Sequence, residues 1–351
     1  MTQDEHRTWV YVGLGGEGEY VGQGGLYRFE DGGEWTAVQK GLPEEPQVRA
    51  LLVHPDDPRI VYAGTQAGVY RSDDRGDHWE ALEPAAEGTD VWSLAFHPGD
   101  PDVVYAGYHP FAIRRSEDGG ATWRSMSTEG VVFPHITTQV PPFDKRVIGI
   151  AADPSDPNDV YAAIEVGGLL ASRDGGDSWE SITDGPHTDI HTLDLHGVTI
   201  SPAAPGTVYI ITRIATFRSR DRGAHWEHVV MDELFPGGCY SRQLLVAPDD
   251  ARTMYLATGA GGGASPKGTV EEAALYRTRD TGESWERVDL GASPRSRMYG
   301  VAVDRAETSR VYCCAGLGEL FSSHDRGETW TITRVPAELS RSRHVYATAC
   351  G

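Results

Sequence analysis

One histidine-rich region of the sequence has residue types and spacings that suit metal chemistry. Its imidazoles alternate with Asp189 and Asp194, and neighbouring segments contribute two more histidines. Neutral imidazoles beside carboxylates suit Zn, Cu or non-haem Fe, and an open coordination position would activate water or oxygen. The sequence therefore suggests a transition-metal site, with ordinary polar loop histidines as the alternative. The candidate ligands are His109, His135, His187, His191 and His196.

A second group of residues is cationic and aromatic. Its arginines fall at or just before segments that we expect to be strands, and its tyrosines stand near them. Guanidinium groups at the mouth of a channel could hold a carboxylate or sulfate through paired hydrogen bonds. Pairing with acids such as Asp90 and Asp194 is the alternative. The candidate ligand-binding residues are Arg49, Arg242, Arg297, Arg343, Tyr240 and Tyr299.

A third pattern, Ser-x-Asp-x-Gly-x-x-Trp, recurs along the chain. Five full copies, a Thr variant and a shortened copy at Asp31–Trp35 make seven. Seven equivalent carboxylates cannot all form one active site, so we expect a structural role. The carboxylate accepts backbone N–H groups across a turn, glycine supplies a positive φ, and tryptophan buries its ring. The aspartates are Asp31, Asp74, Asp118, Asp174, Asp221, Asp280 and Asp325.

The segments between these copies position them on a repeated sheet. Each copy follows a short apolar strand, a Pro/Asp turn and a Val/Tyr strand, as in Leu51–Gly64 and Leu94–Gly107. A third strand such as Gly68–Ser72 leads into the copy and a fourth follows its Trp. Four strands in each of seven units of about 50 residues predict an all-β, seven-bladed β-propeller of antiparallel blades.

The two ends of the chain predict how this ring closes. The N-terminal strand is of the second type, and the C-terminal segment, about 341–351, matches the missing first strand. We therefore expect one propeller domain over 1–351, with the last strand completing the first blade. The irregular segments then fall on the face opposite the repeated turns, where functional residues concentrate on a rigid scaffold.

The repeated motif resembles the Asp-box (BNR) repeats of sialidases, sortilin-type receptors, xyloglucan-degrading enzymes and photosystem II assembly factors. This resemblance covers nearly the whole chain and implies the propeller fold, but the family contains both enzymes and binding proteins. The sialidases that it resembles generally have six blades. Its xyloglucan-degrading relatives place catalytic acids between two propellers, and this chain has room for one.

Composition narrows the function further. A net charge of −21 disfavours binding to nucleic acid. Neither a signal peptide nor a run of 18 apolar residues is visible, so we expect a cytoplasmic protein that does not span a membrane. The four cysteines lack metal-ligand spacing and are expected to be buried thiols.

The sequence thus favours a monomeric, non-catalytic propeller that binds a protein or a small, anionic ligand on its loop-bearing face. A metal-dependent enzyme that uses the histidines is the first alternative. A glycoside hydrolase or sialidase-like hydrolase is the second. A hydrolase of this kind needs two carboxyl groups roughly 5–10 Å apart on that face.

Overall fold

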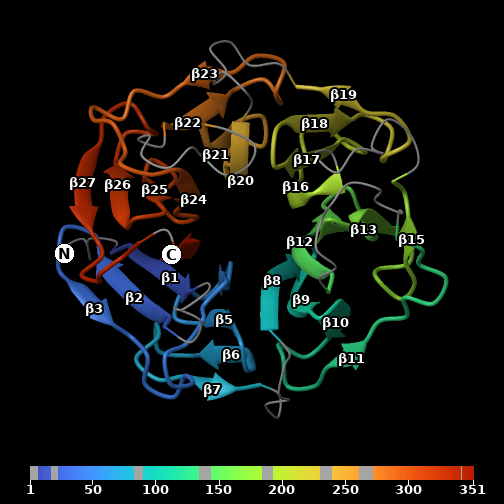
Figure 1. The fold of residues 1–351 in the computed structure, drawn as a ribbon, viewed down its shortest axis with the longest axis horizontal. Coiled ribbons are helices and arrows are strands. Elements are labelled where there is room, and N and C mark those ends of the chain that lie inside the picture. The colour runs from blue at the N-terminus through green and yellow to red at the C-terminus, as the bar shows by residue number, and fades with distance from the viewer. Residues whose placement is uncertain are drawn as a thin grey trace, which may run out of the picture.

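Seven four-stranded antiparallel sheets form a closed ring around a central channel (Figure 1). The structure is a computed structural model, and it describes residues 7–16, 23–82, 90–133, 144–183, 193–229, 239–260, 272–340 and 342–351. All named elements in these ranges are strands, β1 to β28. The predicted seven-bladed, all-β propeller is confirmed. Within the described ranges, no helix is long and apolar enough to cross a membrane.

Each blade runs from an innermost strand at the channel to a short outer strand at the rim. The innermost strands are β28 (Arg343–Cys350), β4 (Ala50–Val53), β8 (Asp90–His97), β12 (Arg146–Asp153), β16 (Leu195–Ile200), β20 (Cys239–Val246) and β24 (Met298–Val303). The second strands are β1 (Trp9–Gly16), β5 (Val61–Thr65), β9 (Asp100–His109), β13 (Asp156–Glu165), β17 (Val208–Thr212), β21 (Met254–Ala260) and β25 (Val311–Ala315).

The third and fourth strands complete each sheet on the rim side. The third strands are β2 (Gly25–Glu30), β6 (Gly68–Ser72), β10 (Ala112–Ser116), β14 (Gly168–Ser172), β18 (Thr216–Ser219), β22 (Ala273–Thr278) and β26 (Glu319–Ser323). The fourth strands are β3 (Trp35–Ala37), β7 (Glu80–Ala81), β11 (Arg124–Ser125), β15 (Glu180–Ser181), β19 (Glu227–His228), β23 (Glu286–Arg287) and β27 (Thr331–Arg334).

The C-terminal strand closes the ring as predicted. β28 pairs antiparallel with β1, from Val10 opposite Cys350 to Gly16 opposite Arg343. One sheet therefore has the order β28-β1-β2-β3 and joins the two ends of the chain. Closure of this kind leaves no blade with an unpaired innermost strand.

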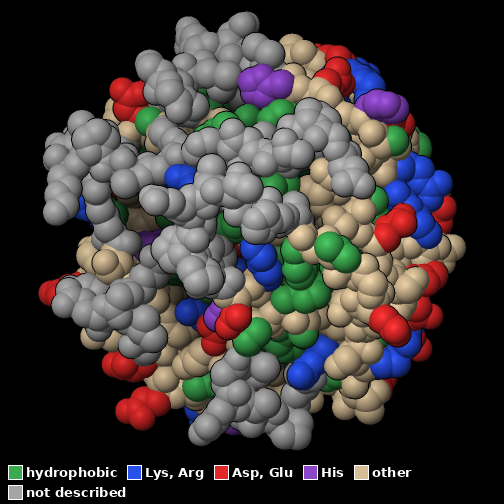
Figure 2. Space-filling view, turned by 45° about the vertical axis from the view of Figure 1, so that its right-hand side comes forward, with side chains coloured by type: hydrophobic (Ala, Val, Ile, Leu, Met, Phe, Trp, Pro, Cys, Tyr) green, Lys and Arg blue, Asp and Glu red, His purple; other side chains and the backbone are tan. Residues whose placement is uncertain are grey.

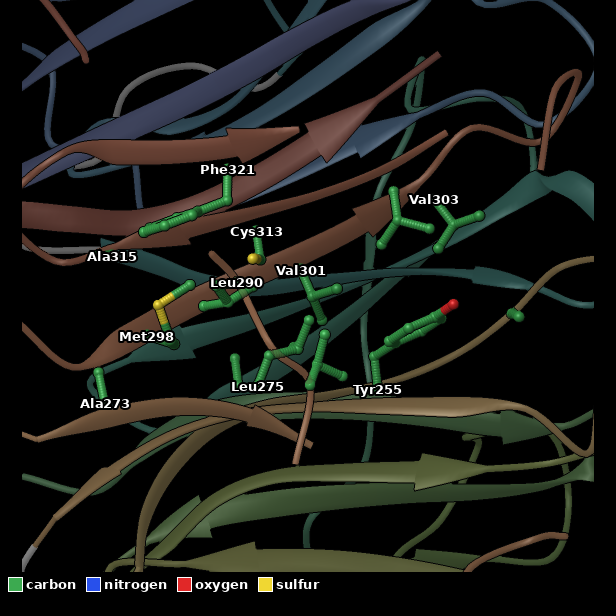
Figure 3. Packing of buried hydrophobic residues seen from close by; sticks show 14 residues of the cluster. Tyr255, Ala273, Leu275, Leu290, Met298, Val301, Val303, Cys313, Ala315 and Phe321 are labelled. Atoms are coloured by element: carbon green, nitrogen blue, oxygen red, sulfur yellow. The ribbon is translucent and has the colours of Figure 1, made fainter. Parts of the chain in front are cut away.

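Apolar clusters fill the space between neighbouring blades. In one cluster, Tyr255 and Leu275 of one blade pack against Val301, Cys313 and Phe321 of the next, as Figure 3 shows. All four cysteines are buried free thiols, which confirms their predicted role as small apolar side chains. Because each cluster draws on two blades, a blade buries its apolar faces only when its neighbours are present.

Six tight turns between third and fourth strands, here called the repeat turns, have one common geometry. In each, the Ser or Thr hydroxyl donates to the Asp carboxylate at 2.7–2.8 Å and accepts the Gly N–H at 2.7–2.9 Å. The Gly residues have φ between +81° and +97°. These turns begin at Ser72, Ser116, Ser172, Ser219, Thr278 and Ser323. The predicted structural use of the motif is observed in all six.

A tyrosine hydroxyl from each blade joins it to the next blade around the ring. In six cases the acceptor is the backbone carbonyl just before the Gly of the next repeat turn, at 2.6–3.4 Å. In the seventh, Tyr312 donates to the Asp31 carboxylate at 2.8 Å. We call these seven bonds the tyrosine seam; its tyrosines are Tyr11, Tyr62, Tyr105, Tyr161, Tyr209, Tyr255 and Tyr312.

Asp31 differs from the other six predicted turn aspartates. Phe29 stands where the others have Ser or Thr, so the turn lacks the hydroxyl that would bond the carboxylate. The carboxylate instead reaches the last blade, where Arg310 lies at 3.0 Å and His324 at 2.8 Å. Asp31 therefore holds the junction between the first and last blades rather than its own turn.

Charged side chains are interspersed along the outer rim, on the right of the view in Figure 2. Arg218, for example, lies 2.7 Å from Glu227 of its own blade and 3.0 Å from Glu283 of the next. Arg277 repeats this arrangement with Glu286 at 2.7 Å and Glu328 at 2.9 Å. The rim thus adds ion pairs between blades to the tyrosine seam.

Removing one hydroxyl of the tyrosine seam should destabilise the ring. Tyr105→Phe loses a bond of 2.8 Å to the Gly175 carbonyl and should lower the free energy of unfolding by about 1 kcal/mol. Tyr312→Phe loses a bond to a carboxylate and should cost about 2 kcal/mol. Urea denaturation measures both, with Tyr27→Phe outside the seam as control. Equal small effects in all three variants would contradict a role for the seam.

The repeat turns should make stability depend on pH in the acid range. Burial opposes ionisation of Asp280, but hydrogen bonds from Ser284 and Thr278 outweigh it and lower its pKa to about 2. The ordinary, unfolded-state value is 3.8, so the ionised folded state is favoured above about pH 4. This stabilisation is lost as pH falls from about 4 to 2.

Asp280→Asn should therefore flatten the dependence of the urea midpoint on pH between 4 and 2. Ser284→Ala removes one donor at 2.6 Å but leaves the carboxylate, and should flatten it less. An Asp280→Asn midpoint that falls as steeply as that of the unmodified protein would refute this assignment.

Candidate functional site

The central channel contains a cavity of about 800 Å³ lined by the innermost strands. One residue from each innermost strand, or from the position just before it, lies within three residues of the start of that strand. These seven residues all line the cavity, and we call them the mouth ring: Arg49, Trp92, Ile148, His196, Arg242, Tyr299 and Tyr346. Each blade thus contributes one side chain that narrows the channel.

A β-bulge in six of the seven blades turns the mouth-ring side chain toward the channel; β4, which follows Arg49, pairs with β5 without a bulge. Where β8 pairs with β9, Val91 faces Tyr108 and Ser93 faces Gly107, so Trp92 is the extra residue. The same one-residue shift leaves out Ile148, His196, Arg242, Tyr299 and Tyr346 in their blades. Bulges re-aim side chains at functional sites, and here the same bulge recurs in six of the seven blades.

Cations and aromatic rings alternate around part of the mouth. The Arg49 guanidinium lies 4.6 Å from the centre of the Trp92 ring, which contacts the Tyr346 ring at 5.8 Å. On the other side, Arg242 lies 5.0 Å from the centre of the Tyr299 ring. Cation–π contacts of this kind hold each guanidinium in one orientation.

The structure places the predicted arginines in different roles. Arg49 lies 3.4 Å from Asp90, as the pairing alternative expected. Arg297 lies 4.3 Å from the centre of the Tyr240 ring. Arg343 donates to the backbone carbonyls of Gln23, Gly24 and Glu338, so it braces the start of β28. Arg242 belongs to the mouth ring, where its remaining accessible surface faces the cavity.

Two carboxyl groups from neighbouring blades lie beside this ring. Glu165, at the end of β13, forms an ion pair with Arg146. Asp194, just before β16, accepts a hydrogen bond from the backbone amide of Val166, the residue after Glu165. Burial raises the pKa of Asp194, although Arg213, Arg242 and Arg146 oppose the rise. Both acids thus lie beside an arginine, Glu165 beside Arg146 and Asp194 at 3.8 Å from Arg213, and burial raises the pKa of Asp194.

His196 is held neutral within the mouth ring. Its Nδ1 lies 3.0 Å from the Ser241 carbonyl oxygen, which can only accept, so Nδ1 carries the proton. Nε2 therefore presents a lone pair, 3.8 Å from an Asp194 oxygen. Burial, with the charge of Arg242 second, lowers the pKa of His196 to about 3. The ring also packs against Tyr240, with centres 4.5 Å apart.

The predicted metal site involves several histidines that the described residues do not include. His135, His187 and His191 lie outside the described residues. His109 ends β9, a second strand, whereas His196 lines the channel. No group of three or more potential ligands is found within the ranges that the structure covers. The transition-metal site therefore stays a prediction.

Comparison with known proteins places this geometry in context. No family model matches the sequence. The chain is 26% identical over 168 residues to the xyloglucanase Xgh74A of Acetivibrio thermocellus, which covers 43% of this chain and 18% of that protein. It is 23% identical over 215 residues to an oligoxyloglucan-reducing end-specific xyloglucanase of Emericella nidulans, covering 52% and 26%.

Solved structures give the same fold. A GH74 enzyme from Niastella koreensis superposes with a TM-score of 0.63 at 21% identity, over 82% of this chain and 45% of that one. YCF48 from Cyanidioschyzon merolae superposes at 0.57 and 15% identity, over 85% and 88%. The chain is thus a seven-bladed β-propeller like these proteins. It spans less than half the length of the GH74 enzyme.

These relatives correct the expected function. The sequence favoured a non-catalytic binding propeller, but the matching curated proteins are named xyloglucanases. That expectation is therefore wrong. It rested on the structural role of the repeated motif, and the motif says nothing about the side chains at the channel mouth. Sequence reasoning named Asp194 beside the candidate metal-binding histidines and as a partner for arginines, and it did not name Glu165 at all.

The state of His196 can be tested directly by NMR. Long-range ¹H–¹⁵N spectra should show one histidine as the Nδ1-protonated tautomer that does not titrate between pH 8 and 5, because its pKa is about 3. His196→Gln assigns the signal. A His196 signal that titrates near the ordinary value of 6.5 would contradict the buried, neutral arrangement.

Proposed function

We propose that this propeller acts on a polysaccharide as a glycoside hydrolase, with Asp194 and Glu165 as its two catalytic carboxyl groups. The observation that carries the proposal is the contrast between them on adjoining blades. Burial raises the pKa of Asp194 even though Arg213 lies 3.8 Å away, whereas Glu165 forms an ion pair with Arg146. Glycosidases require such a pair, because one group donates a proton and the other works as a carboxylate.

The roles follow from these environments. Asp194, as general acid, protonates the leaving glycosidic oxygen. Glu165, as carboxylate, either attacks the anomeric carbon or activates a water molecule on the opposite face of the sugar. The neutral imidazole of His196 stands 3.8 Å from Asp194 and adds no positive charge that would favour ionisation of the acid.

The mouth ring suits a saccharide ligand. The apolar face of a pyranose packs on aromatic rings, and Trp92, Tyr299 and Tyr346 contribute such rings to the cavity. The named xyloglucanases also support a polysaccharide substrate, although their chains are several times longer than the matched part. We propose a β-glucan backbone of this kind as the first substrate to test.

Replacement of either carboxyl group should abolish hydrolysis while leaving the fold intact. Asp194→Asn and Glu165→Gln should each reduce kcat by about 10²- to 10⁴-fold, because each removes a proton transfer or a nucleophile. Release of reducing ends from xyloglucan and its oligosaccharides measures the rate. The unmodified protein should also lose activity as pH rises through the pKa of Asp194.

Asp90→Asn provides the matched control, because Asp90 is a third acid near the mouth and pairs with Arg49. It should change kcat by less than about tenfold. The anomeric form of the first product, observed by ¹H NMR, distinguishes the two roles open to Glu165. Absence of hydrolysis by the unmodified protein, or unchanged rates in Asp194→Asn, would refute the proposal.

A further inference from the structure

The charges around the channel mouth do not balance. Three arginines of this region have a carboxylate within 4.0 Å: Arg49 with Asp90, Arg146 with Glu165, and Arg213 with Asp194. Arg242 has no such partner among the residues that the structure describes. Its guanidinium donates a hydrogen bond to the neutral hydroxyl of Tyr240 at 3.4 Å. Arg242 therefore has no carboxylate in contact among the described residues, although Asp194 and Glu165 act on it from a longer distance.

The surroundings of Arg242 leave it facing the cavity. Protein encloses the guanidinium on its other sides, and the rings of Tyr299 and Tyr240 lie 5.0 and 5.9 Å from its carbon atom. A guanidinium cannot lose its proton in a protein, so the charge persists at any working pH. An enclosed guanidinium without a carboxylate in contact is costly, which favours an anion in the cavity beside it.

A second group beside Arg242 selects for a hydroxyl. His196 is the equivalent residue of the preceding blade, and the charge of Arg242 acts directly on it. With its proton on Nδ1, its Nε2 accepts a hydrogen bond but donates none. Asp194 lies on the same side, 3.8 Å from Nε2. A ligand that fits both groups needs an anionic oxygen for Arg242 and an O–H for Nε2.

We propose that the mouth ring binds a uronate, a sugar whose carboxylate pairs with Arg242 while one hydroxyl donates to Nε2 of His196. This inference rests on the proposed glycoside hydrolase function and names its substrate class as an acidic saccharide. The planar guanidinium meets a carboxylate through two parallel hydrogen bonds. The single positive charge matches the single charge of a uronate and is exceeded by that of sulfate.

A neutral sugar fits this site less well. It would leave the guanidinium with neutral acceptors alone, and hydrogen bonds between charged partners are roughly twice as strong as those between neutral ones. A simple carboxylate such as acetate would pair with Arg242 but would leave Nε2 without a donor. The combination of the two groups therefore discriminates against both.

Calorimetric titration of the full chain with sodium D-glucuronate tests the site, with D-glucose, sodium acetate and sodium sulfate as comparison ligands. Glucuronate should bind at least tenfold more tightly than any of the three. Arg242→Gln should weaken glucuronate binding at least tenfold, and His196→Gln should weaken it severalfold. Arg334→Gln, which removes an exposed guanidinium 3.5 Å from Glu319, is the matched control and should bind normally.

Arg242→Lys guards against loss of folding in Arg242→Gln, as judged by circular dichroism. It keeps the charge but not the paired geometry, so it should bind glucuronate severalfold more weakly than the unmodified protein. Glucuronate binding no tighter than that of glucose, acetate or sulfate would overturn the proposal. So would normal binding by folded Arg242→Gln or Arg242→Lys.

Hydrolysis assays on the same preparations separate this inference from the proposed function. Binding of glucuronate without hydrolysis of neutral or uronate-bearing oligosaccharides would overturn the hydrolase function and leave the binding site standing. Hydrolysis of neutral xyloglucan without glucuronate binding would do the reverse. Hydrolysis of uronate-bearing oligosaccharides that Arg242→Gln slows at least tenfold would support both.

Discussion

The tyrosine seam is the interaction on which the rest of this structure depends. A phenol on the second strand of each blade donates to the repeat turn of the next blade, and the same contact occurs at every junction described. Its acceptor is a carbonyl that the turn itself presents, because the residue before each Gly also has a positive φ. The geometry of the repeat turn therefore also fixes the spacing between neighbouring blades. The width of the channel follows from that spacing.

The hydrogen bond that closes the ring has a different acceptor from the one that repeats at the other junctions. At the last junction Tyr312 meets the Asp31 carboxylate instead of a carbonyl, and Arg310 joins the same oxygen. A charged acceptor strengthens the bond at the junction that also joins the chain ends through β28 and β1. If all seven junctions had the same contact, the junction between the first and last blades would be no stronger than the others. In this protein the charged Asp31 carboxylate makes that junction stronger.

The sequence predicted the features that repeat in every blade, but it missed many of those that differ from blade to blade. Motif copies such as Ser72–Trp79 predicted blade number, strand order and closure, because seven copies average out local ambiguity. The mouth ring was predicted only in part, because a bulge moves one residue out of the two-residue periodicity on which strand prediction depends. The members named as candidate site residues from the sequence were Arg49, His196, Arg242 and Tyr299. A signal existed: five of the seven positions, all but Tyr299 and Tyr346, precede a Pro of the first-to-second turn by six residues, as Trp92 precedes Pro98.

The function was wrongly predicted for a similar reason, because residues that differ between blades come together only in the fold. Arg242 was identified from its place near a strand start, but His196 was grouped with His187 and His191 because they are close in sequence. The fold instead sets His196 beside residues of the next blade, such as Tyr240 and Arg242. Glu165 carries no motif, and only the pairing of β12 with β13 brings it opposite Arg146. Chemistry at the mouth is thus assembled across blades, where the spacing of residues along the chain gives little guidance.

This propeller has a net charge of −21 but carries arginines around its channel. Electrostatic interactions therefore differ between its outer rim and its channel mouth. On the rim, pairs such as Arg220 with Glu283 are exposed to solvent, so salt screens them and their contribution is small. Within the channel, Arg49, Arg146 and Arg242 lie where protein displaces water, and screening there is weaker. The acidic exterior repels an anion over long distances, whereas the mouth attracts it at contact. Selectivity for a charged ligand can therefore reside in the mouth ring alone, and the repeated scaffold supplies only its geometry.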